Sequence, residues 1–189
     1  MPRPPILPTI DWRAVFAGGL DYDVWIRQGE SPESRRKMEE DLAALALEPH
    51  QAAALAALPR DVHVLAIAED WCGDVVRHVP PLQRLAAAGP RLHVRYVTRA
   101  GRPDVFARFL TCGGEAIPKF IFLSADFVEC GHWGPMPERC RELIARGKAL
   151  GDVKLARERV SALYAADPTR REAIEELMSL IAIASTTIL

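Results

Sequence analysis

Cysteines are few in this sequence, and no two of them have the CxxC spacing of a dithiol redox site. The four cysteines are Cys72, Cys112, Cys130 and Cys140. They could supply one or two disulfides in a secreted protein, but in a reducing cytosol they remain free thiols, and a redox function would then rest on one reactive thiolate. The histidines are scattered, with Cys130 and His132 as the nearest Cys–His pair, so no zinc-binding spacing is present and we expect no metal site.

The sequence also lacks an excess of either charge and any long apolar run. Its 24 basic and 25 acidic residues give no electrostatic reason to expect nucleic acid or an anionic membrane as a partner. The N-terminal sequence MPRPPILPTIDW has no apolar run long enough for a signal-peptide core, and the C-terminal LMSLIAIASTTIL is too short to span a bilayer. We therefore expect a cytoplasmic protein whose tail is a helix packed on the domain, with a partner-binding tail as the alternative.

The order of helix and strand signals predicts an α/β fold. The first ten residues are proline-rich and predicted to be extended, and Ser31 with Pro32 is a good helix start. Residues 62–68 are almost wholly apolar, as in a strand buried on both faces, and residues 92–97 alternate as a second strand. Two further strands, 119–123 and 127–133, are predicted to form a hairpin. The predicted helices cover residues 31–48, 50–58, 72–88, 103–110, 137–146, 153–165 and 168 onward, the last capped by Asp167.

This order indicates a central mixed four-stranded sheet with helices on both sides. A strand–helix–strand unit makes the first two strands parallel through a right-handed crossover, and the hairpin adds an antiparallel pair. With 189 residues and 49% hydrophobic content, the chain is long enough for one well-buried core and short for two. We therefore expect one domain overall.

Three features carry a resemblance to a known family. Trp71-Cys72-Gly73 follows the first predicted strand and opens the next helix, Pro80 lies eight residues after Cys72, and Ile117-Pro118 directly precedes a strand. In this order and spacing they resemble the active-site W-C-G, the helix-kinking proline and the cis-proline loop of the thioredoxin superfamily. The resemblance implies a thioredoxin-like fold with extra N- and C-terminal helices.

The resemblance covers residues 61–147, which we expect to form the thioredoxin-like core. Residues 1–60 would be an N-terminal helical extension, and residues 148–189 would be C-terminal helices packed on the core. The sequences WCGD, GGxxIPK and WGPxP, together with Leu163-Tyr164 in the tail, are similar to a bacterial thioredoxin-like subfamily of poorly defined function. That subfamily commonly lacks the second active-site cysteine.

Three departures from the thioredoxin pattern weaken the case for an ordinary dithiol reductase. Val75 stands where the resolving cysteine would be, three residues after Cys72. Ala66 occupies the position of the buried aspartate that moves protons during exchange in thioredoxins, and Asp74 replaces the usual proline. A similar fold does not fix the activity, so each residue is considered by its own chemistry.

The position of Cys72 at a helix N-terminus favours its thiolate form, because free backbone N–H groups and the helix dipole stabilise an anion there. The carboxylates of Glu69, Asp70 and Asp74 oppose this, and Arg77 would offset them in part. An alternative role for Asp70 is to cap the helix. On balance we expect a modestly lowered pKa for Cys72.

The leading functional hypothesis is a monothiol thiol–disulfide oxidoreductase with Cys72 as the nucleophile. Its substrate would be a protein disulfide or a small-molecule thiol, held by the Ile117-Pro118 loop. Trp71, Gly73 and Asp74 would frame the site.

A lone thiolate needs a second thiol for its release from a mixed disulfide. Glutathione or another small thiol would supply it as a co-substrate, and no other cofactor is expected. The internal alternative is Cys112, six residues before Pro118, as a resolving cysteine. The simpler interpretation of Cys112 is a small buried residue at a helix end.

The competing hypothesis is a non-catalytic binding or chaperone-like module. Here the face around Cys72 and the Pro118 loop would hold a partner peptide without electron transfer. The helices before residue 61 and after residue 150 would then supply a partner surface or the contact of a homo-oligomer.

Overall fold

A four-stranded mixed sheet forms the centre of the protein. The computed structural model describes residues 7–186, and its strands are β1 (Val62–Ile67), β2 (Leu92–Val97), β3 (Lys119–Leu123) and β4 (Glu129–Trp133). They lie in the order β2-β1-β3-β4, with β1 parallel to β2 and the other two pairs antiparallel. The predicted α/β fold with a mixed four-stranded sheet is therefore confirmed.

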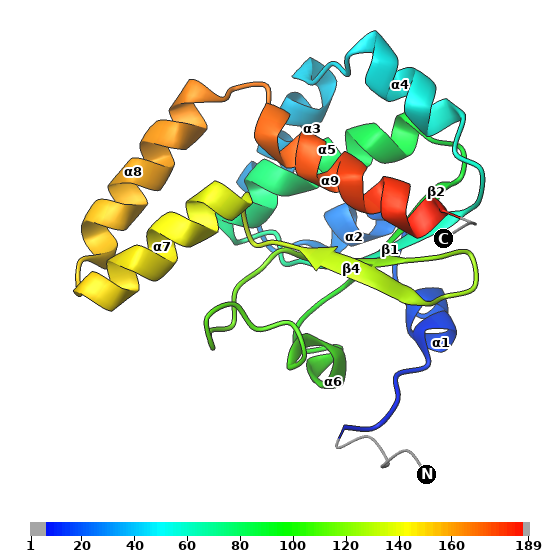
Figure 1. The fold of residues 1–189 in the computed structure, drawn as a ribbon, viewed down its shortest axis with the longest axis horizontal. Helices are drawn as coiled ribbons and strands as arrows, with labels where there is room; N and C mark the ends of the chain where they lie inside the picture. The colour runs from blue at the N-terminus through cyan, green and yellow to red at the C-terminus, as the bar shows by residue number, and fades with distance from the viewer. Residues whose placement is uncertain (1–6, 187–189) are drawn as a thin grey trace.

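Helices cover both faces of this sheet (Figure 1). The α-helices of the described residues are α1 (Trp12–Ala17), α2 (Tyr22–Gln28), α3 (Pro32–Ala44), α4 (Pro49–Ala56), α5 (Gly73–Ala88), α6 (Pro103–Phe106), α7 (Glu138–Leu150), α8 (Val153–Ala166) and α9 (Arg171–Ser185). Helices α5 and α9 cover one face, with α3 and α4 packed outside α5. Helices α1 and α6 lie toward the opposite face.

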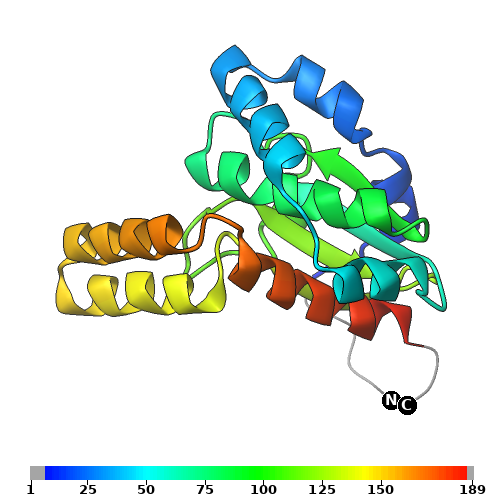
Figure 2. The ribbon, with the colours of Figure 1, turned by 90° about the horizontal axis from the view of Figure 1, so that it is seen from above.

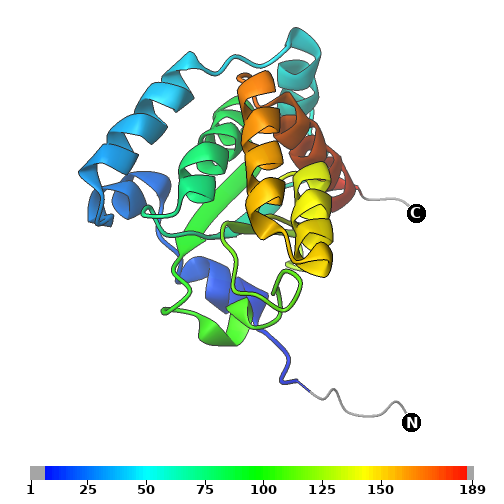
Figure 3. The same cartoon turned by 90° about the vertical axis from the view of Figure 1, so that its left-hand side faces the viewer.

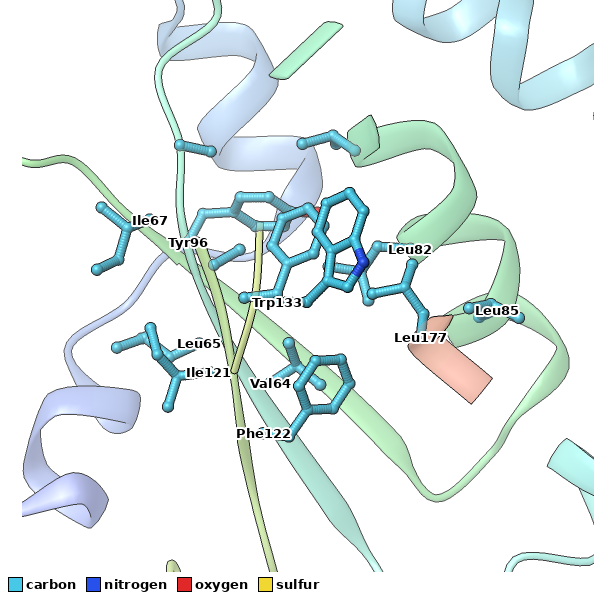
Figure 4. Close-up of a cluster of buried hydrophobic side chains, with 14 of the residues drawn as sticks. Val64, Leu65, Ile67, Leu82, Leu85, Tyr96, Ile121, Phe122, Trp133 and Leu177 are labelled. Carbon is cyan, nitrogen blue, oxygen red and sulfur yellow. The ribbon is translucent and has the colours of Figure 1, made fainter. Parts of the chain in front are cut away.

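The main core fills the space between the sheet and helices α5 and α9. Figure 4 shows Phe122 and Trp133 from the sheet close to Leu82 of α5 and Leu177 of α9. The Trp133 ring is almost fully buried and stacks on Phe120 at 5.4 Å between ring centroids. The continuous apolar pattern of β1 follows from this arrangement, because the strand is covered on both faces.

Helices α1 and α2 were absent from the sequence prediction. They contain six and seven residues, which is too short for a helix to be stable alone in water. Packing keeps them helical: α1 buries Val15 and Phe16, and α2 buries Trp25, whose ring stacks on Tyr96 at 4.5 Å. Short-range patterns carry little signal for such elements, because their stability comes from tertiary contacts.

Local capping explains where two of the predicted helices begin. The Ser31 hydroxyl accepts a hydrogen bond from the Ser34 backbone N–H, as expected for a cap of α3. Both carboxylate oxygens of Asp167 accept backbone N–H groups, from Arg171 and from Glu172, at the start of α9. Asp167 thus caps the last helix, which begins at Arg171 and not at residue 168 as predicted.

The antiparallel helices α7 and α8 extend away from the sheet, as Figure 2 shows, and Figure 3 views the molecule from the side on which they project. Their backbones approach closely at Gly147, where an added Cβ would lie 2.5 Å from the Cβ of Ala156. The chain then returns along α9 across the sheet, so the C-terminal end of α8 lies near α5. Within residues 7–186, no helix is both long and apolar enough to cross a lipid bilayer.

Candidate functional site around Cys72

Cys72 lies where the chain leaves the buried strand β1 and enters α5. A turn between them is closed by a hydrogen bond from the Cys72 backbone N–H to the Glu69 carbonyl. Cys72 is the N-cap residue of α5 and has extended backbone angles, and the backbone N–H groups of Asp74 and Val75 in the first turn act on its sulfur. The thiol is half-buried, and its Sγ donates to the Ile117 carbonyl oxygen at 3.5 Å.

The segment before β3 forms the second side of the site. The peptide bond between Ile117 and Pro118 is cis, and both residues are buried. Lys119, the first residue of β3, pairs with Ile67 near the end of β1, which brings this loop beside Cys72. Sequence neighbours complete the surroundings: the Trp71 side chain is 53% exposed, Gly73 is exposed and Asp74 is half-buried.

The pKa of Cys72 is raised, and the expectation of a lowered value is wrong. Burial is the largest cause, because a thiolate loses hydration inside the protein. The backbone N–H groups of Val75 and Asp74 lower the pKa, as a helix N-terminus should, but they do not overcome the loss of hydration. The Asp74 carboxylate raises it further, and the Arg99 guanidinium lowers it.

Two of the acidic neighbours are engaged elsewhere. Glu69 accepts from both the backbone N–H of Arg99, at 3.2 Å, and its Nε, at 2.9 Å. Asp70 is buried and accepts the backbone N–H groups of Glu30 and Ser31, at 3.1 and 2.7 Å. The suggestion that Asp70 caps α5 is therefore wrong, because its carboxylate binds the loop between α2 and α3.

The basic side chain that lowers the pKa of Cys72 is Arg99, and not Arg77 as the sequence suggested. The Arg77 side chain turns toward the C-terminal helices, where its Nη2 donates to the carbonyl oxygens of Tyr164 and Asp167. The Arg99 guanidinium lies 5.2 Å from the centre of the Trp71 ring, within the range of a cation–π contact. Arg99 follows β2 at the same distance as Glu69 follows β1, and the carboxyl ends of parallel strands lie at the same edge of a sheet. The ion pair between Arg99 and Glu69 could therefore have been predicted from the sequence.

Asp74 is linked to the C-terminal helices through Tyr164. The Tyr164 hydroxyl donates to Asp74 Oδ1 at 2.9 Å and lies 3.2 Å from Nε2 of His78. Burial raises the pKa of Asp74, and the hydrogen bond from Tyr164 followed by the charge of Arg77 counteracts this. Burial also lowers the pKa of His78 well below its usual value, so this imidazole is neutral at pH 7.

Cys112 lies in the exposed turn between Thr111 and Gly114, with a φ angle of 50°. The interpretation of Cys112 as a small buried residue is therefore wrong. Its neighbours include Lys119, whose pKa responds to the Cys112 thiol. Cys130 is half-buried and Cys140 is buried; all four cysteines are free thiols.

Residues 19–151 match the model of a protein family described as "Thioredoxin". The chain belongs to this thioredoxin family. The match begins between α1 and α2 and ends just after α7. No curated protein sequence matches the chain.

Two solved structures resemble this thioredoxin-family protein in fold. A protein of unknown function from Pseudomonas aeruginosa is 17% identical, with a TM-score of 0.71 over 92% of this chain and 98% of the other. An HIV epitope scaffold is also 17% identical, with a TM-score of 0.69 over 91% of this chain and 98% of the other. At this identity the likeness concerns the fold alone.

The thioredoxin-family protein has apolar side chains at both positions where a dithiol enzyme would carry reactive groups. Val75 is completely buried in the first turn of α5, and Ala66 is completely buried in β1. Asp74 instead provides a half-buried carboxyl group near the thiol. Within residues 7–186, no cluster of three or more His, Cys, Asp or Glu side chains could hold a metal ion.

Proposed function

We propose that this protein is a monothiol thiol–disulfide oxidoreductase with Cys72 as its nucleophile. The observation that carries the proposal is the contact of the Cys72 thiol with the Ile117 carbonyl at the N-terminus of α5, beside the exposed Trp71 ring. A substrate chain lying along the Ile117-Pro118 loop would present its sulfur to Cys72, with Trp71, Gly73 and Asp74 framing the site. Residues 61–147 would form the catalytic core, and the helices on either side of it would be extensions.

The chemistry proceeds through one mixed disulfide. The Cys72 thiolate attacks one sulfur of a substrate disulfide, a new S–S bond forms, and the other substrate sulfur leaves as a thiolate that takes up a proton. A thiolate of glutathione or a similar small thiol then attacks this bond and releases Cys72. For a substrate that carries glutathione, Cys72 takes over the glutathionyl group and the substrate leaves as its thiol. One free glutathione then releases Cys72, so the net reaction converts the glutathionylated substrate and one glutathione into the substrate thiol and glutathione disulfide. The protein would therefore work in a compartment rich in small thiols, such as the cytoplasm.

The raised pKa of Cys72 predicts how this activity depends on pH. Only a small fraction of the thiol is ionised at pH 7, and the fraction grows as the pH rises toward the pKa. The rate of mixed-disulfide formation should therefore increase about tenfold per pH unit below the pKa, in proportion to the thiolate concentration.

The direct test is to incubate the native protein with oxidised glutathione at pH 7, 8 and 9 and to measure glutathione adducts on each cysteine by mass spectrometry. Cys72 should form a mixed disulfide that reduced glutathione removes, and Cys72→Ser should abolish turnover of a glutathionylated peptide. Cys130→Ser is the matched control and should keep full turnover. Turnover that survives Cys72→Ser would refute the proposal.

The same assay distinguishes the two sources of the second thiol. If Cys112 resolves the mixed disulfide, Cys112→Ser should lengthen the lifetime of the Cys72 adduct in the absence of added thiol. If a small thiol resolves it, the lifetime should depend on the glutathione concentration alone.

A second function, binding of an extended peptide without electron transfer, is favoured by the raised pKa of Cys72 and by the buried Val75. In that case the exposed Trp71 would be the main contact, and the flanking helices would add surface for a partner or a second copy. This alternative predicts no mixed disulfide on Cys72 between pH 7 and 9.

A further inference from the structure

A separate cavity of about 560 Å³ lies between the turn at Thr111–Gly114, the start of β3 and the first turns of α7. Its lining includes three basic side chains, Lys119, His132 and Arg141, which come from β3, β4 and α7. Lys119 and His132 belong to the same face of the sheet, because Lys119 alternates with Phe120 along β3 while His132 pairs with Ile121. Trp133 and Phe120 point to the other face, toward α5.

Lys119 is the unusual member of this group. It is 2% exposed, although lysine is almost never buried without a charged partner. Its Nζ donates to the Thr111 hydroxyl and, at 2.8 Å, to the Gly134 carbonyl, and both acceptors are neutral and line the same cavity. No ion pair joins a described carboxylate to Lys119 or to Arg141 within 4.0 Å.

The basic groups repel one another across the cavity. Burial, followed by the charge of Arg141, lowers the pKa of Lys119 to about 8, and the nearby Cys112 counteracts this only in part. Burial, followed by the charges of Lys119 and Arg141, lowers the pKa of His132. An anion bound between these groups would offset their repulsion and stabilise the protonated forms of Lys119 and His132.

The two carboxylates that line the cavity do not compensate these charges. Glu142 is paired with Arg146 along α7, at 2.6 Å. Glu138 is exposed at the start of α7 and makes no ion pair with Lys119 or Arg141 among the described residues. The Arg141 guanidinium donates through Nη1 to the Met136 carbonyl, which leaves its other N–H groups available.

We infer that this cavity binds a small oxyanion, the carboxylate or phosphate group of a small molecule, between Lys119 and Arg141. The Thr111 hydroxyl would add a neutral donor, since Lys119 supplies the hydrogen bond that it accepts. Cys112 lies at the exposed edge of the site, so an occupant should shield its thiol. The inference does not depend on electron transfer by Cys72.

The test uses inorganic phosphate and succinate as probes, titrated into the full chain by calorimetry at pH 7 and constant ionic strength set with sodium chloride. Saturable binding of one equivalent is expected. Arg141→Gln should weaken it about tenfold or more, because a charged donor is lost. Arg139→Gln is the matched control, since Arg139 lies on the same helix and lines a different surface, and it should leave the affinity unchanged.

Two further measurements use the unaltered chain and therefore test the inference even if a variant unfolds. Binding to the unaltered chain should weaken between pH 7 and 9 as Lys119 loses its proton, and either anion should slow alkylation of Cys112 by iodoacetamide. Lys119→Met, checked for folding by circular dichroism, should bind neither anion. A preference for phosphate over succinate, or the reverse, distinguishes the two sources of the oxyanion. Absence of saturable binding by the unaltered chain, or equal affinities of the Arg141→Gln and Arg139→Gln variants, would overturn the inference.

Discussion

The hydrogen bond between Tyr164 and Asp74 joins α8 to the first turn of α5, ninety residues apart in the chain. Tyr164→Phe removes only the hydroxyl and keeps the ring, including its contact with the Arg77 guanidinium, which lies 4.0 Å from the ring centre. Asp74 then loses its hydrogen-bond donor while remaining partly buried. Because hydrogen bonds to charged groups are worth about 1.5–3 kcal/mol, we expect the free energy of unfolding at pH 7 to fall by about 2 kcal/mol.

A double-mutant cycle separates this bond from other effects of the tyrosine hydroxyl, such as its contact with His78. In the Asp74→Ala background, Tyr164→Phe should cost less than 1 kcal/mol, so the coupling energy should be about 1–2 kcal/mol. Urea denaturation followed by circular dichroism measures all four proteins. A coupling energy below about 0.5 kcal/mol, the usual limit of additivity, would refute the reasoning.

The cycle also predicts a change with pH. The pKa of Asp74 is raised in the folded state, so its contribution to stability is present below the unfolded pKa and is lost as the pH rises through the folded pKa. Loss of the Tyr164 hydroxyl raises that pKa further. The deficit of Tyr164→Phe should therefore be larger at pH 7, where the Asp74 carboxylate is charged, than at pH 3, where the protonated carboxyl group keeps only a weaker, neutral hydrogen bond.

Three further predictions concern the Cys72 site and the neighbouring cavity. Arg99→Gln should slow alkylation of Cys72 by iodoacetamide at pH 8, because the guanidinium lowers the pKa of that thiol; an unchanged rate would contradict this. The pKa of Lys119 is about 8 in the folded protein and 10.5 in the unfolded chain, so the unfolded state holds the proton more tightly. The contribution of Lys119 to the free energy of unfolding should therefore rise by about 3 kcal/mol between pH 8 and pH 10.5. Lys119→Met should remove this rise, as measured by urea denaturation across that pH range. Gly134→Ala should lower the unfolding free energy by about 3 kcal/mol or more, since φ is 116° and the new Cβ would lie 2.1 Å from the Pro118 carbonyl oxygen; near-native thermal stability would disprove it.

The local sequence was sufficient to predict the sheet and the place of Cys72. The apolar run of β1, the short loop that follows it and the helical pattern of α5 are all properties of neighbouring residues, and they place Cys72 at a helix N-terminus. The Ser31 cap and the hairpin of β3 and β4 were predictable for the same reason, because each depends on residues a few positions apart. Helices α1 and α2 were not, since they are stable only when their apolar side chains pack on the sheet.

The electrostatics of the site depended on the tertiary structure. The acidic residues around Cys72 were evident in the sequence, but their partners were not: Asp70 binds a segment 40 residues earlier, and Asp74 binds Tyr164 far later in the chain. The direction of the Cys72 pKa shift depends on how completely other segments exclude water from its thiol, and burial outweighs the helix N-terminus. Residue types and their spacing therefore identified the nucleophile, while the amount of water left around it, which long-range packing controls, decided its ionisation.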